Sequence, residues 1–280
     1  MSYHKNGMRR VWIAAVLCCL PVFGADSDPI EHAFDRLYNF DFAGAQQILN
    51  QRIAEHPQDP LPYSVRAAGY LFFELDRLGI LESEFLISDK RIAEKKKLLP
   101  DPGIRDRFYK ALADVQSRGD AALAANPNDR SALLAMCISQ GVATDYMALI
   151  EKRQLSSLAP AKRANGYAQR LLKLDPKFYD AYVAAGFSEY MLGSLPFFFR
   201  WFVHFDNVTG DKQSGVAHLK LVAGEGHYLK PFAKILLGII ALREKKPQEA
   251  QRLLMDLARS YPDNPLFRKE LAKLNTQLGN

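Results

Sequence analysis

One helix-turn-helix pattern near the C-terminus constrains the fold of this chain more than any other feature. Within the 34-residue window 231–264, Leu237-Gly238 is followed by Ala250-x3-Leu254 and then by Pro262. A small residue where two helices cross, an apolar residue a turn later and a closing proline let a helical pair stack on a copy of itself. The pattern therefore predicts stacked helical pairs, with helices too close at Gly238 for a branched side chain.

Four prolines mark the expected ends of such units. Each follows an Ala/Leu-rich stretch and has an Asp or Asn nearby that can cap the next helix. These prolines are Pro57, Pro127, Pro176 and Pro262. Ten residues after each proline stands a small residue, and we expect these residues at helix crossings. They are Ala67, Cys137, Gly186 and Ala272.

The spacing of these marks predicts an all-α fold, a right-handed α-solenoid of about five divergent units with insertions and a C-terminal capping helix. The expected single domain covers 25–280, with the insertions at 81–101, 142–163 and 191–210. Its units are expected at 29–60, 61–129, 130–178, 179–230 and 231–264, with the cap at 265–280.

The 34-residue window follows the offsets of the tetratricopeptide repeat (TPR). The chain also resembles a group of uncharacterised bacterial exported TPR proteins, in the stretches Phe187–Pro196, Gly210–Lys212, Gly226–Leu229 and Tyr261–Phe267. Leu37–Ala45 is similar to the start of the eukaryotic TPR family that includes yeast inclusion-body-clearance proteins. The resemblance spans about residues 30–270 and implies the repeat fold, but it brings no known catalytic residues.

The first 24 residues read as a secretory signal peptide. Lys5, Arg9 and Arg10 precede an apolar run over 11–22, which ends in small residues that suit a signal peptidase. About 12 apolar residues rise only about 18 Å as a helix, which is short for a bilayer core of about 30 Å. We expect an exported protein, periplasmic or secreted. An N-terminal membrane anchor is the alternative, and a lipid anchor on Cys18 is disfavoured because Leu17 precedes it.

Charge and cysteine content limit the possible partners. Loss of the three basic residues of the signal lowers the formal net charge from +6 to +3, and no dense basic stripe remains. We therefore expect no nucleic-acid partner. Cys137 would be alone in the exported chain, so the fold depends on a packed core and not on an internal disulfide.

Signatures of catalysis are missing from the sequence. It contains no H-E-x-x-H, G-x-S-x-G, Walker loop or C-x-x-C, so we predict no enzymatic activity, no cofactor and no metal. His218, Glu225 and His227 are the residues closest to a metal-ligand pattern. We interpret these histidines as structural, because one lies within a helix and the other beyond a glycine turn.

The first hypothesis for function is an exported scaffold that binds a peptide or protein on its concave face. First-helix residues line that face in TPR arrays, and by register they include Leu61, Ser64, Ala68 and Leu71 in the second unit. The candidate partner-binding residues in later units are Asp180, Val183, Phe187, Tyr190, Phe232, Ile235, Ile239 and Leu242. This surface is largely apolar, so extended or helical apolar segments are the expected ligands.

The second hypothesis rests on the aromatic segment 197–205. Its aromatic density exceeds what a repeat requires, so it either fills space opened by an insertion or forms an apolar ligand or membrane-surface site. Its candidate binding residues are Phe197, Phe198, Trp201 and Phe202.

Overall fold

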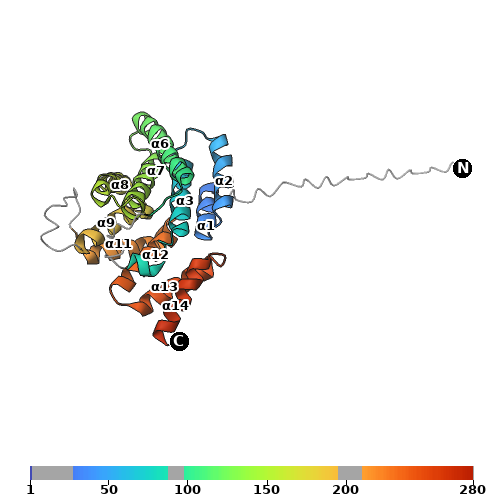
Figure 1. The fold of residues 1–280 in the computed structure, drawn as a ribbon. Coiled ribbons are helices and arrows are strands. Elements are labelled where there is room, and N and C mark those ends of the chain that lie inside the picture. The colour runs from blue at the N-terminus through green and yellow to red at the C-terminus, as the bar shows by residue number, and fades with distance from the viewer. Residues whose placement is uncertain (2–27, 88–97, 195–209, 280) are drawn as a thin grey trace.

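The structure is a computed structural model that describes Met1 and residues 28–87, 98–194 and 210–279. Every regular element in these residues is a helix, and the helices pack mostly in chain order (Figure 1). The expected all-α fold is confirmed at this level. The longer helices are α1 (Pro29–Tyr38), α2 (Phe42–Glu55), α3 (Leu61–Arg77), α6 (Pro102–Ala125), α7 (Arg130–Asp145), α8 (Gln154–Leu174), α9 (Tyr182–Ser194), α11 (Lys212–Glu225), α12 (Lys230–Arg243), α13 (Pro247–Ser260) and α14 (Pro265–Leu278).

The four proline turns share one geometry. In each, the amide two residues after the proline donates to the carbonyl of the residue before it, with N···O distances of 3.1, 3.0, 3.0 and 3.2 Å. The side chains of Asp59, Asp129 and Asn264 then accept a hydrogen bond from an amide in the first turn of the following helix. Tyr63 and Tyr182, each six residues after a proline, donate to that proline's carbonyl. The predicted proline turns are confirmed.

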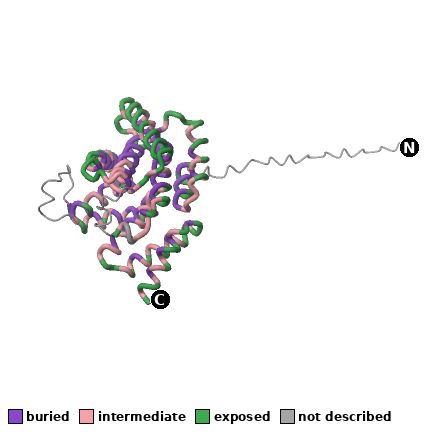
Figure 2. Tube along the Cα trace, viewed as in Figure 1, coloured by how far each residue is buried: buried purple, intermediate pink, exposed green. Residues whose placement is uncertain are grey.

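Helix α7 lies at the centre of the fold. It packs against α3, α6 and α8, and its residues 132–140 are all buried, as the purple tube in Figure 2 shows. After Asp145 the helix widens into the π-helix η1 (Tyr146–Ile150), where the Tyr146 ring stacks on Phe108 with 4.4 Å between centroids. Among the described helices, only the stretch Arg130–Ile150 is long and apolar enough to cross a membrane. Within it, 56% of the 18-residue window that passes this test is buried, as expected of a core helix.

The sequence predicts helix crossings at both Gly186 and Gly238, and the structure has a close crossing at Gly186 alone of these two. A Cβ atom built on Gly186 of α9 would lie 2.9 Å from the Gly215 carbonyl oxygen of α11, so these helices meet backbone to backbone. A Cβ atom on Gly238 would meet nothing within 4 Å, and the expected close crossing there is wrong. Ala67 and Cys137 are buried as expected for crossing residues, whereas Ala272 is exposed because it lies on the outer side of the last helix.

The two ends of the described chain meet. Helix α1 lies against the turns that precede α12 and α14, and Tyr38 donates to the Tyr228 carbonyl oxygen at 3.0 Å (Figure 1). Residues 82–86, which include the short helix α4 (Ser83–Leu86), contact α12 and α14. The structure also contradicts the open partner-binding face that the register predicts in the second unit. The residues expected there, Leu61, Ser64, Ala68 and Leu71, are all buried.

Candidate functional site

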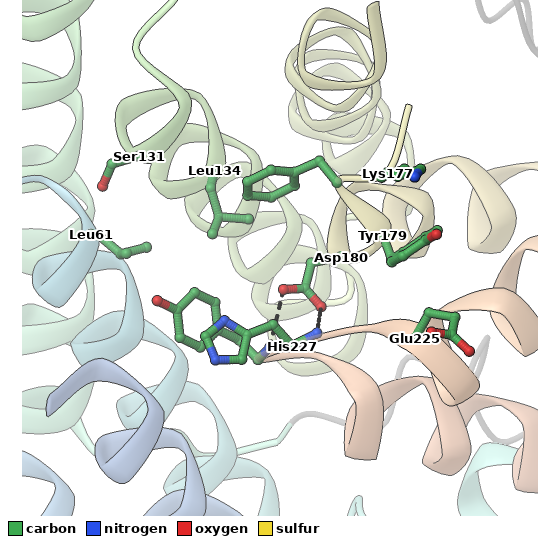
Figure 3. Close-up of a pocket in the computed structure, with 10 residues that line it drawn as sticks. Leu61, Ser131, Leu134, Lys177, Tyr179, Asp180, Glu225 and His227 are labelled. Atoms are coloured by element: carbon green, nitrogen blue, oxygen red, sulfur yellow. Dashed lines mark hydrogen bonds between the residues drawn. The ribbon is translucent and has the colours of Figure 1, made fainter. Parts of the chain in front are cut away.

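A cleft of about 310 Å³ opens where four parts of the chain converge (Figure 3). The starts of α3 and α7 supply Leu61, Ser131 and Leu134 to its wall. Residues 177–180, which include the start of the 3-10 helix η2 (Tyr179–Ala181), form a second side. Glu225 at the end of α11, with His227 and Tyr228 after it, forms a third. The cleft thus joins segments that lie more than 160 residues apart in the sequence, from Leu61 to Tyr228.

Asp180 holds two of these walls together. Its buried carboxylate accepts hydrogen bonds from the backbone amides of His227, Tyr228 and Leu229, at 2.9, 3.0 and 3.1 Å. Figure 3 shows the carboxylate facing this turn. Helix α12 begins after Leu229, whose apolar side chain cannot cap it. Asp180 therefore fixes the turn before α12 from another helical pair, because all three amides lie at or before the residue that precedes the helix.

Several polar groups around the cleft have no partner within the described part of the chain. The Lys177 ammonium, the Tyr179 hydroxyl and the Glu225 carboxylate form no hydrogen bond or ion pair there, nor does the Ser131 hydroxyl. They surround an apolar surface formed by Leu134 and its neighbours. This arrangement of free donors and acceptors beside apolar side chains suits a ligand that has both kinds of group.

Tyr228 separates the cleft from α1. The Tyr228 ring stacks on Phe34, with 5.5 Å between centroids, and its hydroxyl donates to Asp28. Burial and the neighbouring Asp28 carboxylate raise the Tyr228 pKa well above its ordinary value, so the hydroxyl stays protonated and keeps donating. The His227 ring stacks on Tyr228 at 4.2 Å, and its Nε2 lies 3.3 Å from the Glu31 carboxylate.

The partner-binding residues predicted from the sequence do not form one open surface. Asp180, Val183 and Tyr190 are buried. Phe232 is half-buried and its ring lies 5.9 Å from Phe72, so it packs between helices. The other half-buried candidates are Phe187, Ile235, Ile239 and Leu242. Of the predicted partner-face residues that the structure describes, Asp180 and Leu61 appear in the cleft wall. Phe197, Phe198, Trp201 and Phe202 lie outside the described residues.

The sequence offered only weak signals for the cleft residues it missed. Lys177 and Tyr179 follow Pro176 in a turn that was identified only as a unit boundary. His227 and Glu225 flank Gly226 and were considered only as metal ligands. The described residues contain no group of three His, Cys, Asp or Glu side chains that could hold a metal ion.

His218 belongs to a separate polar cluster. Its Nδ1 lies 2.8 Å from Glu189 Oε2, and Ser214 donates to the same oxygen at 3.0 Å. In a catalytic triad the imidazole contacts the nucleophilic hydroxyl, whereas here both the imidazole and the hydroxyl contact the carboxylate. The cluster therefore joins α9 to α11 and does not have the order of contacts of a catalytic triad.

Comparison with protein families, with curated proteins and with solved structures finds no match to this chain. The interpretation of the cleft therefore rests on its own residues.

Proposed function

We propose that the protein is an exported, non-enzymatic scaffold of the TPR type that binds an extended peptide segment of a partner protein in the cleft. The repeated proline turns, with their shared hydrogen bonds and cap residues, support a TPR-like solenoid. The signal-like N-terminus supports export to the periplasm or beyond. A mature protein that begins at Ala25, identified by mass spectrometry, would agree with export, and an intact N-terminus would contradict it.

The observation that carries the peptide proposal is the set of unpartnered polar groups around an apolar wall. An extended peptide exposes backbone donors and acceptors that need partners once they leave water. Lys177 and Tyr179 can donate to peptide carbonyls, and Glu225 can accept from peptide amides. Leu61 and Leu134 then offer an apolar contact to one peptide side chain.

Charge reversal at Lys177 tests this proposal. Lys177 is exposed and unpaired within the described residues, so Lys177→Glu should leave the fold intact. Peptides selected from a displayed random library on the wild-type protein should bind this variant roughly tenfold more weakly. Lys173→Glu is the matched control, because Lys173 is equally exposed on α8 but does not line the cleft. Equal affinity of the two variants for the selected peptides would reject the cleft as the binding site.

A further inference from the structure

A second hollow, which we call the α12 groove, lies over helix α12 near the C-terminus. Its volume is about 390 Å³, and it shares no lining residue with the cleft. Helices α11 and α13 form its two sides, and both pack against α12. The lining residues are Lys220, Ala223 and Gly224 of α11, Lys234 and Leu237 of α12, and Glu249, Arg252, Leu253 and Asp256 of α13.

Each of the three helices turns one side toward the α12 groove. The lining residues within a helix follow each other mostly at spacings of three or four positions, which place side chains on the same side of a helix. Along α13 the groove extends from Glu249 to Asp256, about 10 Å of helix. A groove of this length suits a small molecule.

Two glycines leave space in and beside the groove. A Cβ atom on Gly224 would meet nothing within 4 Å. The same holds for Gly238, which follows Lys234 by one turn on the same side of α12. Glycine within a helix lowers its stability. Close packing explains the glycine at Gly186, where a Cβ atom would lie 2.9 Å from the Gly215 carbonyl oxygen, but it does not explain Gly224 or Gly238.

All but one of the charged side chains that line the groove are paired with each other. Lys220 lies 3.8 Å from Glu249, and this ion pair bridges α11 and α13 at one end of the groove. Lys234 pairs with Asp256 at the other end. Arg252 is exposed and forms no hydrogen bond or ion pair within the described part of the chain. The groove therefore carries one uncompensated positive charge.

The charge of the surrounding chain also favours an anion. Residues 210–279 contain twelve Lys and Arg residues against seven Asp and Glu residues. An excess of positive charge attracts negative ligands over a longer range than a single contact does. Arg252 adds specificity at short range, because a guanidinium group binds a carboxylate through two parallel hydrogen bonds.

The groove beside Arg252 is apolar. Leu237 of α12 is buried, whereas Leu253 and Ala223 on the two sides are half-buried and keep contact with water. An apolar chain that covers these side chains would remove their surface from water. The bridge between Lys220 and Glu249 crosses the groove at one end, so a compact ligand fits better than a polypeptide that runs through it.

We propose that the α12 groove binds a small aliphatic carboxylate. The carboxylate group pairs with Arg252, and the chain lies over Leu237 and Leu253 in the space beside Gly224. A fatty acid of medium chain length is the simplest molecule with this chemistry. The site is independent of the peptide cleft and gives the protein a second ligand of a different chemical class.

Titration with octanoate, followed by calorimetry, gives the first test. The wild-type protein should bind octanoate at least tenfold more tightly than octanamide, which keeps the chain but has no charge. Arg252→Gln should weaken octanoate binding roughly tenfold, because it removes the charged partner of the carboxylate. Arg259→Gln is the matched control, because Arg259 is exposed on the same helix but does not line the groove. No binding to the wild type, or equal affinity of the two variants, would overturn the proposal.

Filling the groove gives the second test. Gly224→Leu puts a side chain into the open space of the wall, so octanoate binding should be lost while the melting temperature stays at or above that of the wild type. Gly166→Leu is the matched control, because Gly166 of α8 is equally exposed, faces equally open space and lies outside the groove. Octanoate binding that survives Gly224→Leu would reject the site.

A third variant separates this site from the peptide cleft. Lys177→Glu should leave octanoate affinity unchanged, whatever it does to peptide binding, because Lys177 lines the cleft and not the α12 groove. If Lys177→Glu weakens octanoate binding and Arg252→Gln does not, the carboxylate binds in the cleft and the α12 groove is rejected as its site.

Discussion

At the scale of single residues, Asp180 shows how one side chain organises distant backbone. It was predicted as a partner-binding residue, but its carboxylate is occupied by three amides of the turn before α12. A buried carboxylate with three backbone donors is a strong structural contact, because charge-assisted bonds are worth more than neutral ones.

Asp180→Ala should therefore lower the free energy of unfolding by about 3 kcal/mol, since it orphans three amides at once. Urea denaturation measures this change. Asp129→Ala, which removes one amide contact from the cap of α7, is the comparison and should cost about 1 kcal/mol. If Asp180→Ala lowers the free energy of unfolding no more than Asp129→Ala does, the three amide contacts of Asp180 do not stabilise the fold to the expected extent.

Asp145 predicts a dependence of stability on pH. Burial raises its pKa to about 7, and within the described residues its carboxylate forms no hydrogen bond or ion pair. The unfolded chain releases this proton near pH 4, whereas the folded state keeps it up to about pH 7. Between these values the folded state binds more protons, so the contribution of Asp145 to stability falls as the pH rises through this window.

Asp145→Asn should raise the free energy of unfolding by roughly 1–3 kcal/mol at pH 8 and change it little near pH 4. Asp145 is only half-buried, so we expect a gain in the low part of this range. Urea denaturation of both proteins at the two pH values measures the difference. A variant that is less stable than the wild type at both would rule out an unpaired buried charge.

At the scale of helices, Gly186 and Gly238 should respond in opposite ways to substitution by alanine. Gly186→Ala would place its Cβ 2.9 Å from both the Gly215 carbonyl oxygen and the His218 Cβ, so α9 and α11 must separate. We expect a loss of about 1–3 kcal/mol. Gly238→Ala meets open space and should gain about 0.5–1 kcal/mol from helix propensity.

Thermal unfolding of these two variants gives the test at the helix scale. A shift of the melting temperature down for Gly186→Ala and up for Gly238→Ala is expected. A melting temperature of Gly186→Ala that is no lower than that of the wild type would contradict the close crossing of α9 and α11, and a downward shift for Gly238→Ala would contradict the open space beside Gly238.

At the scale of the whole molecule, the closure makes the two ends depend on each other. In an open solenoid each unit contacts only its neighbours, so loss of the last helix affects the C-terminal end alone. Here Asn264 and α14 contact α1 and residues 82–83. Deletion of residues 264–280 should therefore raise amide hydrogen exchange in α1 at least tenfold.

Helix α8 serves as the internal control in that experiment. It packs against α7 and α9 and makes none of the hydrogen bonds between α1 and the C-terminal turns, so its exchange should change far less than that of α1. Unchanged exchange in α1 after the deletion would show that the ends fold independently.

The sequence by itself determined the local structure of this protein. Proline, Asp and Asn at the four turns specify where helices stop and start, because capping and the loss of an amide act within a few residues. Helix α2 ends at Glu55, just before Pro57, and α14 begins at Pro265, just after Pro262, for that reason. Only the tertiary structure decided which small residues meet, that Asp180 binds the turn before a helix some 50 positions later, and that α1 closes against the last turns. Contacts such as Asn264–Tyr38 join residues 226 positions apart, and no local periodicity specifies which of many apolar and polar surfaces will meet at that distance.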